Sequence, residues 1–212
     1  MDTVEWLSHL LPCPKELSVD DSIEIEPAHL AIEIAGAANP LVEQAAAELR
    51  DLLPSQGETA RRDPSFTVTL GIPDAQGRLG SISIDVDFLR SCPNAEQAYL
   101  IQPVGRDGLA IAALDGRGLY YGSSTLRQLL NASRSAERIL VPLVHVRDWP
   151  DLSERGLWNF PNEQNWIPWM ADMKLNFGKM VATQLAPIQR GQPNSATIDR
   201  DLMLESRRRA FN

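Results

Sequence analysis

The sequence has few cysteines and no long hydrophobic run. Only Cys13 and Cys92 occur among 212 residues, and their separation fits neither a metal-binding spacing nor a disulfide framework. We expect two reduced structural thiols, with a bridge between them as the less favoured alternative. No segment approaches the roughly 20 consecutive apolar residues that cross a bilayer, and the N-terminus lacks the basic start and apolar run of a secretory signal. These absences predict a soluble, cytoplasmic chain with no membrane partner.

An excess of positive charge is also lacking. The 20 Lys and Arg residues stand against 28 Asp and Glu residues, which gives a formal net charge of −8. Such a balance opposes adhesion to phosphate backbones, so we expect no nucleic-acid partner. With 43% hydrophobic residues the chain is apolar enough to bury a core. Its length suits one full domain plus part of another.

Metal and nucleotide motifs are missing as well. His9, His29 and His145 are scattered, with no carboxylate or cysteine at ligand spacing. The absence of a His-Glu-x-x-His motif excludes zinc-dependent proteolysis. The glycine-containing segments 105–108 and 115–118 match no complete nucleotide-binding fingerprint, and turns explain both. We therefore expect no metal and no cofactor.

Residues 1–148 show a mixed succession of strand and helix patterns. Alternating or β-branched segments predict strands, and apolar residues at helical spacing predict helices. The expected strands cover residues 22–26, 30–34, 66–72, 97–104, 108–114 and 139–146, and the expected helices cover 41–53, entered through Asn39 and Pro40, and 120–130. The strands on either side of the 105–108 turn should form an antiparallel hairpin, and the polar segment after Ile72 should be a loop. This order predicts an α+β domain over residues 1–148, an open sheet with helices on one face.

The character of the sequence changes beyond residue 148. Four of the five tryptophans gather there: Trp149, Trp158, Trp166 and Trp169. The patterns predict a strand at 156–159, a helix at 167–177, a strand at 181–186 and a helix at 198–210. That alternation is typical of the opening of an α/β fold, so we treat 149–212 as a second region.

Several motifs occur in an order that is more specific than any one of them alone. They are Leu11-Pro12-Cys13-Pro14, the segments 96–101, 108–111, 115–122 and 125–130, the segment 141–151 followed by Glu154-Arg155-Gly156, and the segment 170–176. Together they resemble the N-terminal region of family 20 glycoside hydrolases, the β-N-acetylhexosaminidases. The resembling accessory domain is shared with family 84 hexosaminidases and some α-glucuronidases.

The resemblance implies a zincin-like accessory α/β domain at 1–148, followed by the beginning of a (β/α)8 catalytic barrel at 149–212. A complete TIM barrel takes about 250 residues, whereas 61 residues follow Asp151. The chain thus resembles the front of an enzyme whose partners are a carbohydrate substrate and the remaining barrel. At full length it would hydrolyse glycosidic bonds of amino-sugar-containing glycans. The alternative is a non-catalytic module that binds carbohydrate or a protein and supports a catalytic barrel.

Catalysis in this family is substrate-assisted. The acetamido oxygen of the sugar attacks the anomeric carbon, an Asp orients that group, and a neighbouring Glu is the general acid. These carboxylates follow a middle barrel strand for which the sequence supplies no residues. No catalytic residue is therefore assigned, and we expect the 212-residue chain alone to be inactive.

Two residues are predicted to bind substrate, Arg155 and Trp158. Arg155 matches the family's barrel-strand arginine, whose planar guanidinium binds hydroxyls of the terminal sugar, so we expect it at the carboxyl or inner side of the strand. The alternative is an ion pair at the domain junction with Asp148 or Asp151. The family pattern continues with an aspartate five residues later, where Phe160 stands here. That departure indicates a divergent branch with altered substrate preference.

The tryptophans allow sugar stacking, because pyranose CH faces pack on indole rings. Trp158 is the better candidate because it shares the predicted strand with Arg155. Trp166 and Trp169 lie three residues apart on a predicted helix and share a face. For that pair we favour packing in the core over contact with a sugar.

Overall fold

The computed structural model describes residues 3–53, 64–157, 166–178, 183–185, 196–198 and 200–211. The chain forms two compact units, Met1–Ser153 and Glu154–Asn212. In the described residues no helix is both long enough and apolar enough to cross a membrane.

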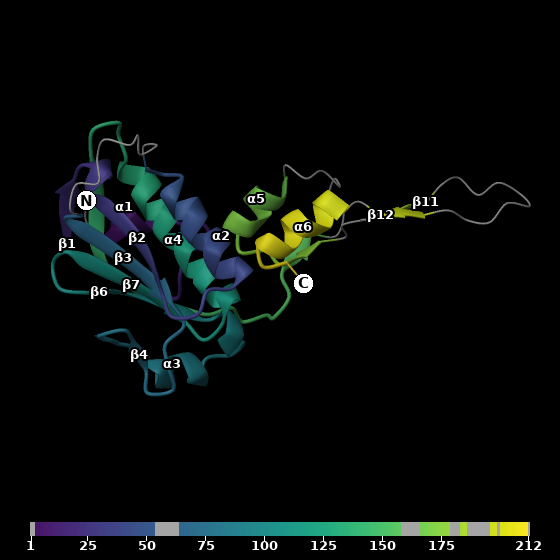
Figure 1. Cartoon of the computed structure of the whole chain (residues 1–212), viewed down its shortest axis with the longest axis horizontal. Helices are drawn as coiled ribbons and strands as arrows, with labels where there is room; N and C mark the ends of the chain where they lie inside the picture. Colours follow the sequence, from purple (N-terminus) through teal and green to yellow (C-terminus); the bar gives the residue numbers. More distant parts are fainter. Residues whose placement is uncertain are drawn as a thin grey trace, which may run out of the picture. The chain divides into compact units, whose positions relative to one another are not determined.

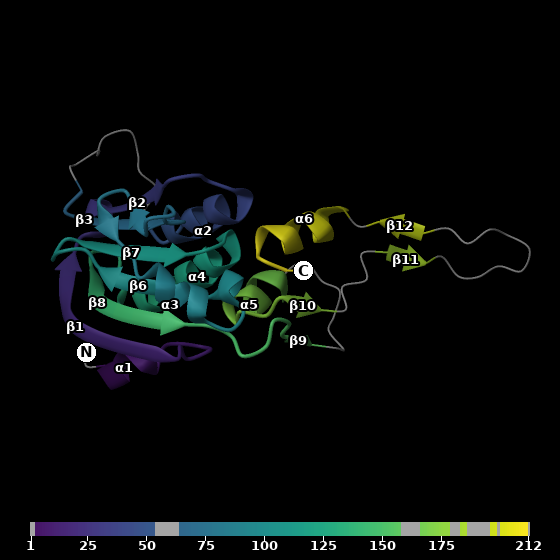
Figure 2. The same ribbon diagram turned by 90° about the horizontal axis from the view of Figure 1, so that it is seen from below.

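The first unit is built on a six-stranded mixed sheet (Figures 1 and 2). Its spatial order is β1 (Glu16–Ile25), β8 (Ile139–Asp148), β6 (Tyr99–Pro103), β7 (Gly108–Ala113), β3 (Phe66–Gly71) and β2 (Leu30–Ala35). The three strands β2, β3 and β7 run parallel, and the other neighbours are antiparallel. The α+β class and all six of the expected strand regions are confirmed, although β1 begins at Glu16, six residues earlier than expected.

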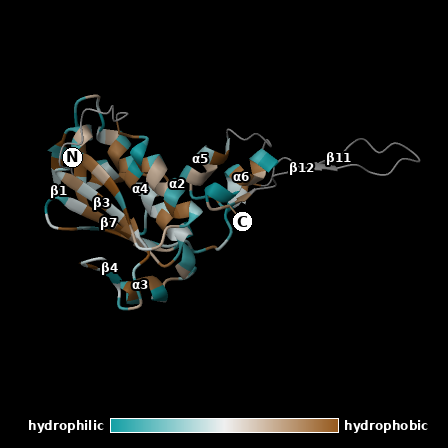
Figure 3. Cartoon of the chain, viewed as in Figure 1, coloured by the Kyte–Doolittle hydropathy of each residue, from teal (hydrophilic) through white to brown (hydrophobic). Residues whose placement is uncertain are grey.

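The expected hairpin lies in the middle of the sheet. Tyr99 pairs with Ala113, and Pro103 pairs with Leu109. Gly105 takes a left-handed φ of 66° in the turn between the strands, which glycine adopts at little cost. Every residue of β7 is buried, as expected for a strand covered on both faces. Hydrophobic residues accordingly gather in the central strands (Figure 3).

Two long helices, α2 (Pro40–Arg50) and α4 (Gly116–Ser133), pack on one face of this sheet (Figure 1). Asn39 is the N-cap of α2, as expected, since its side chain accepts hydrogen bonds from the backbone N–H groups of Leu41 and Val42 at 3.0 and 3.1 Å. The helix buries Val42, Ala45, Ala46 and Leu49. It ends at Arg50, slightly before the predicted limit.

The second helix begins earlier than the sequence pattern predicted. We expected a helix from Tyr120, but α4 starts at Gly116, and the Asp115 side chain caps it by accepting from Arg117 N–H at 3.0 Å. Two glycines in the first turn conceal this start, because glycine is a poor helix former. Gly118 is needed for close packing, since a Cβ there would lie 2.3 Å from the Ala98 carbonyl oxygen. Tertiary packing therefore overrides local propensity.

The opposite face of the sheet carries a smaller layer that the sequence did not predict. The segment after Ile72, expected to be a loop, forms β4 (Arg78–Leu79), β5 (Ile82–Ser83) and α3 (Val86–Ser91). Its apolar residues Leu79, Ile84 and Leu89 form a buried cluster with Leu100, Ala98, Ala110 and Ala112. The expectation of helices on one face holds for α2 and α4 and is wrong for α3 (Figure 2). The apolar residues of this segment are too irregularly spaced to show a period.

Short elements complete the first unit. Helix α1 (Thr3–Leu7) buries Trp6. The 3-10 turn η1 (Pro27–His29) joins β1 to β2, and η2 (Ala95–Gln97) lies between α3 and β6. After β8, the Trp149 ring packs edge-on against Phe88, with ring centroids 5.7 Å apart.

The second unit contains a parallel strand pair joined by a helix. Strand β9 (Gly156–Leu157) pairs in parallel with β10 (Phe177–Gly178), and α5 (Trp166–Asp172) lies between them in the chain. The helix predicted for 167–177 therefore ends early. Lys174 takes a left-handed φ of 55°, and the N–H of Leu175 bonds to the Met170 carbonyl at 2.9 Å. This pattern is a Schellman motif, which terminates helices.

The remainder of the second unit also departs from the predicted alternation. Strand β11 (Thr183–Leu185) lies inside the strand expected at 181–186, but it pairs antiparallel with β12 (Ala196–Ile198). Helix α6 (Arg200–Arg208) then begins two residues later than expected. The second parallel strand is β10, so the expected order of the elements after α5 is wrong.

The glycines of α4 provide a graded test of this packing. We expect Gly118→Ala to lower the free energy of unfolding by about 2–3 kcal/mol, because the new methyl group meets backbone that cannot move away. Gly122→Ala should cost about 1 kcal/mol, since its methyl would meet the Ile111 and Tyr99 side chains, which can shift, and alanine favours the helix. Urea denaturation measures both. The exposed position Asn131→Ala on α4 is the control, and equal effects at 118 and 131 would contradict this account.

Candidate functional site

Arg155 lies directly before β9 and is half-buried. Its backbone N–H donates to Asn176 Oδ1 at 2.8 Å, and its carbonyl accepts from the N–H groups of Asn176 and Phe177 at 2.9 and 3.1 Å. These contacts join the start of one parallel strand to the start of the next. Arg155 is therefore at the amino end of the described strand, and its expected place at the carboxyl or inner side of a complete barrel strand stays a prediction.

The guanidinium of Arg155 is oriented by a backbone carbonyl. Its Nε and Nη2 atoms donate to the Lys174 oxygen at 3.1 and 2.9 Å. Because the guanidinium is planar, two bonds to one acceptor fix the direction of the whole group. The alternative of an ion pair with Asp148 or Asp151 joins residues of the two separate units, and it stays a hypothesis.

The predicted aromatic residues fall into two groups. Trp158 and Phe160 lie outside the described residues. Trp166 and Trp169 on α5 meet edge to face, with ring centroids 5.8 Å apart. Their exposed fractions within this chain are 39% and 45%, and their packing against the barrel or the accessory domain stays a prediction. The buried residues of α5 are Ile167, Met170 and Ala171.

A buried polar network at the end of β8 was missed by the sequence reading. Asp148 lies beyond the strand expected at 139–146 but is the last residue of β8, and its carboxylate accepts from the Tyr99 hydroxyl at 2.9 Å and from Lys15 N–H at 3.1 Å. The Tyr99 and Thr125 hydroxyl oxygens lie 2.6 Å apart. Burial, with the Asp148 charge beside it, raises the pKa of Tyr99 well above its ordinary value. Tyr99 thus remains a neutral donor to a buried carboxylate.

The chain that follows β8, residues 149–153, is held by side chains of the first unit. Asn94 Nδ2 donates to the Pro150 carbonyl and Gln97 Nε2 to the Ser153 carbonyl, both at 2.9 Å. Lys15 Nζ pairs with Asp151 at 2.6 Å. The Gln97 side chain is buried although polar residues precede it, so the sequence pattern did not mark this contact. This anchoring explains why the first compact unit extends to Ser153.

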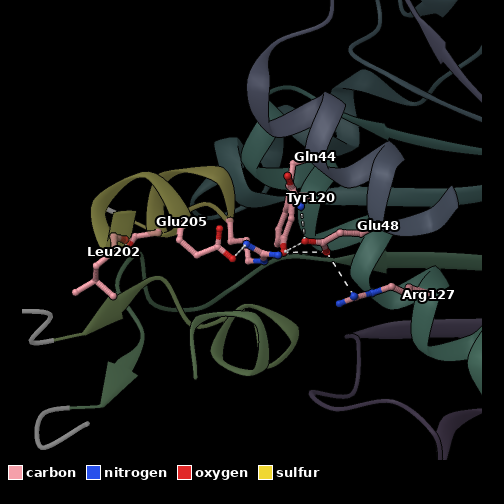
Figure 4. A network of polar contacts seen from close by, with 8 residues as sticks. Gln44, Glu48, Tyr120, Arg127, Leu202 and Glu205 are labelled. Carbon is pink, nitrogen blue, oxygen red and sulfur yellow. Dashed lines mark hydrogen bonds and ion pairs between the residues drawn. The ribbon is translucent and has the colours of Figure 1, made fainter. Parts of the chain in front are cut away.

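Another polar network joins α2 to α4 (Figure 4). The Glu48 carboxylate accepts from Gln44 Nε2 at 2.9 Å and from the Tyr120 hydroxyl at 3.1 and 3.2 Å, and Arg127 Nη1 lies 3.5 Å away. One carboxylate thereby links three donors on two helices. The arrangement is suited to fixing the helices, and it contains no paired carboxylates for acid–base chemistry.

The cysteines and His145 show no arrangement for catalysis or metal binding in the described residues. Cys13 and Cys92 are both free thiols, as expected, and burial raises the pKa of Cys92 above its ordinary value. His145 pairs with Asp20 at 3.0 Å on the surface. Within the residues that the structure describes, no group of three or more His, Cys, Asp and Glu side chains is arranged to hold a metal. A surface depression of about 560 Å³ is lined by residues 24–28 and 136–138, where Glu24 is paired with Arg138.

The Tyr99 network predicts an alkaline loss of stability. With its pKa raised in the folded protein, Tyr99 keeps a proton that the unfolded chain releases above pH 10 or so, and the free energy of unfolding should therefore fall as pH rises past that value. Tyr99→Phe should flatten this fall. At pH 8 the same variant should be less stable by about 1–3 kcal/mol, since Asp148 and Thr125 lose a buried partner. Urea denaturation between pH 8 and 11 measures both effects. Identical alkaline slopes in the two proteins would contradict this assignment.

Comparison with known proteins gives these features a family. The model for glycosyl hydrolase family 20, domain 2, matches residues 8–149. A Porphyromonas gingivalis β-hexosaminidase is 27% identical over 154 residues, covering 70% of this chain and 18% of that protein. Among solved structures, the Flavobacterium johnsoniae chitobiase aligns with a TM-score of 0.62 at 14% identity, covering 100% of this chain and 34% of its own. The Vibrio harveyi exo-β-N-acetylglucosaminidase in complex with N-acetylglucosamine aligns with a TM-score of 0.59 at 17% identity, covering 97% and 35%.

The likeness to the two solved structures concerns the fold, and the chain spans between 18% and 35% of the length of these relatives. The family assignment rests on the domain model, which covers more than half of the chain and has the mixed sheet with α2 and α4 as its body. This chain therefore belongs to glycosyl hydrolase family 20.

Proposed function

We propose that the chain is the N-terminal portion of a longer glycoside hydrolase that cleaves glycosidic bonds of amino-sugar-containing glycans. The observation that carries the proposal is the parallel β9–α5–β10 unit, which directly follows the family domain at residues 8–149. Parallel strands require a crossover connection, and repeated strand–helix units of this kind build a TIM barrel. On this proposal, residues 1–148 are the accessory domain and residues 149–212 begin the catalytic barrel.

The substrate follows from the relatives. The solved proteins of similar fold are named as a chitobiase and an N-acetylglucosaminidase, and the curated relative is a β-hexosaminidase. A terminal N-acetylhexosamine is therefore the substrate class that we propose for the longer protein. The antiparallel β11–β12 pair before α6 interrupts the simple strand–helix alternation.

Arg155 and Trp158 are the substrate-binding residues of the proposal. TIM-barrel sites open at the carboxyl ends of the strands. A terminal pyranose that enters from that side with its glycosidic bond outward presents its opposite edge, the 3- and 4-hydroxyls, to the barrel interior. A residue low on the first strand, such as Arg155, suits contact with that edge because its guanidinium can donate to two adjacent oxygens.

An activity assay tests the proposal. The purified 212-residue chain should release no 4-nitrophenol from 4-nitrophenyl N-acetyl-β-D-glucosaminide above background, because no catalytic carboxylate pair is assigned to it. A longer polypeptide from the same reading frame should release it. Hydrolysis that co-purifies with the 212-residue chain would overturn the placement of the chemistry. An inactive longer polypeptide would favour the non-catalytic module.

Arg155→Lys in the active longer polypeptide tests the role of the arginine. Lysine keeps the charge and loses the planar fork, so we expect kcat/KM to fall by at least about tenfold with little change in melting temperature. Arg127→Lys, at a helix surface of the accessory domain, is the matched control and should leave kcat/KM unchanged. If Arg155→Lys unfolds the protein while the folded fraction keeps normal kcat/KM, the arginine is structural.

A further inference from the structure

Asn176 is a fully buried polar residue that contacts Arg155 from two directions. Its exposed fraction is 0%, its side-chain oxygen accepts the Arg155 N–H at 2.8 Å, and its own N–H donates to the Arg155 carbonyl at 2.9 Å. A buried polar side chain is retained at a cost unless its hydrogen bonds are made. Here one side-chain and one backbone hydrogen bond of Asn176 join the backbone of Arg155. Asn176 thus fixes where the arginine side chain begins.

Lys174 fixes the other end of the same side chain. Its left-handed φ of 55° is uncommon for a residue with a Cβ, and glycine or asparagine is usual at this position of a Schellman motif. The conformation places the Lys174 carbonyl where it accepts both Nε and Nη2 of Arg155. Backbone strain of this kind persists where surrounding contacts hold it, and it often accompanies functional positions.

Gly156 allows the two strands to come close enough for these contacts. A Cβ at this position would lie 1.8 Å from the Phe177 carbonyl oxygen, so no other residue fits without moving the backbone. Arg155 and Gly156, at the start of β9, therefore lie beside the turn 174–176 that precedes β10. The Lys174 carbonyl, the Asn176 side chain and the close strand spacing at Gly156 thus all restrict the position of Arg155.

We infer that the turn 174–176 positions Arg155 for its ligand, with Asn176 holding its backbone and the Lys174 carbonyl holding its guanidinium. Asn176 is on this inference a positioning residue, which contacts the arginine and not the sugar. The inference rests on the proposed function, in which Arg155 binds vicinal hydroxyls of a pyranose. A guanidinium held in one plane selects two oxygens at one spacing and orientation, which a freely rotating side chain does not.

Asn176→Leu tests the positioning in the 212-residue chain, because leucine is similar in size and has no acceptor. In ¹⁵N spectra we expect the Arg155 Nε–H to exchange with solvent at least about tenfold faster than in the unchanged chain, since the side chain loses its fixed origin. Asn176→Asp keeps an oxygen at the accepting position and should restore slow exchange. Unchanged exchange in a folded Leu variant would overturn the inference. If the Leu variant does not fold, Asn176→Ser is measured instead. Its shorter side chain moves the oxygen away from the Arg155 N–H, and the same faster exchange of the Arg155 Nε–H is expected.

Kinetics in the longer polypeptide separate this inference from the proposed function. Asn176→Leu should raise KM for the chromogenic N-acetylglucosaminide by about fivefold or more with a smaller change in kcat, because a mobile guanidinium binds the ground-state hydroxyls less well. If Arg155→Lys impairs kcat/KM and Asn176→Leu changes only the melting temperature, the positioning role is wrong and the function stands. If neither substitution changes KM, the assignment of Arg155 to the sugar fails first.

Discussion

The close approach of α4 to the central strands is the contact on which the first unit depends. Gly118 lies against the Ala98 carbonyl and the Ala113 methyl, and Gly122 lies against Ile111 and Tyr99. A helix that carries Cβ atoms at these points would be held farther from β6 and β7, and the layer of buried side chains between them would open. The glycines at the start of α4 lower its helical propensity, and the close packing that they allow offsets that loss. The resulting sheet is covered on both faces, by α2 and α4 on one side and by α3 with its small hairpin on the other.

Polar groups that this close packing encloses need hydrogen-bond partners, because water does not reach them. Asp148 is tolerated at the end of β8 because Tyr99 and the Lys15 amide donate to it, and Tyr99 is a suitable donor because burial keeps its hydroxyl protonated. The side chains of Asn94 and Gln97 bond to the chain beyond β8 at Pro150 and Ser153. The first unit thus holds the segment that follows β8 by directed hydrogen bonds as well as by apolar contact.

The second unit also depends on close backbone contacts. A left-handed residue ends α5, a glycine lets β9 and β10 pair, and a buried asparagine and one carbonyl hold Arg155. Family 20 membership and the parallel strand pair together support a barrel that begins here. The exposed faces of Trp166 and Trp169 are consistent with a helix that has further apolar neighbours in a longer polypeptide.

The sequence by itself determined the elements whose pattern is local and strong. The alternation in β3, the glycine turn between β6 and β7, and the Asn39–Pro40 entry into α2 all identify structure from neighbouring residues. The ordered motifs between Leu11 and Asp151 indicated the family, whose model matches residues 8–149. Tertiary structure decided the rest. The start of α4 depends on a carbonyl of another element, the α3 layer depends on burial against β6 and β7, and the end of α5 depends on Lys174 adopting a conformation that lysine rarely takes. The partners of Arg155 come from residues 174 and 176, across a helix from it. No periodicity reports such contacts, because each is made between atoms that only folding brings together.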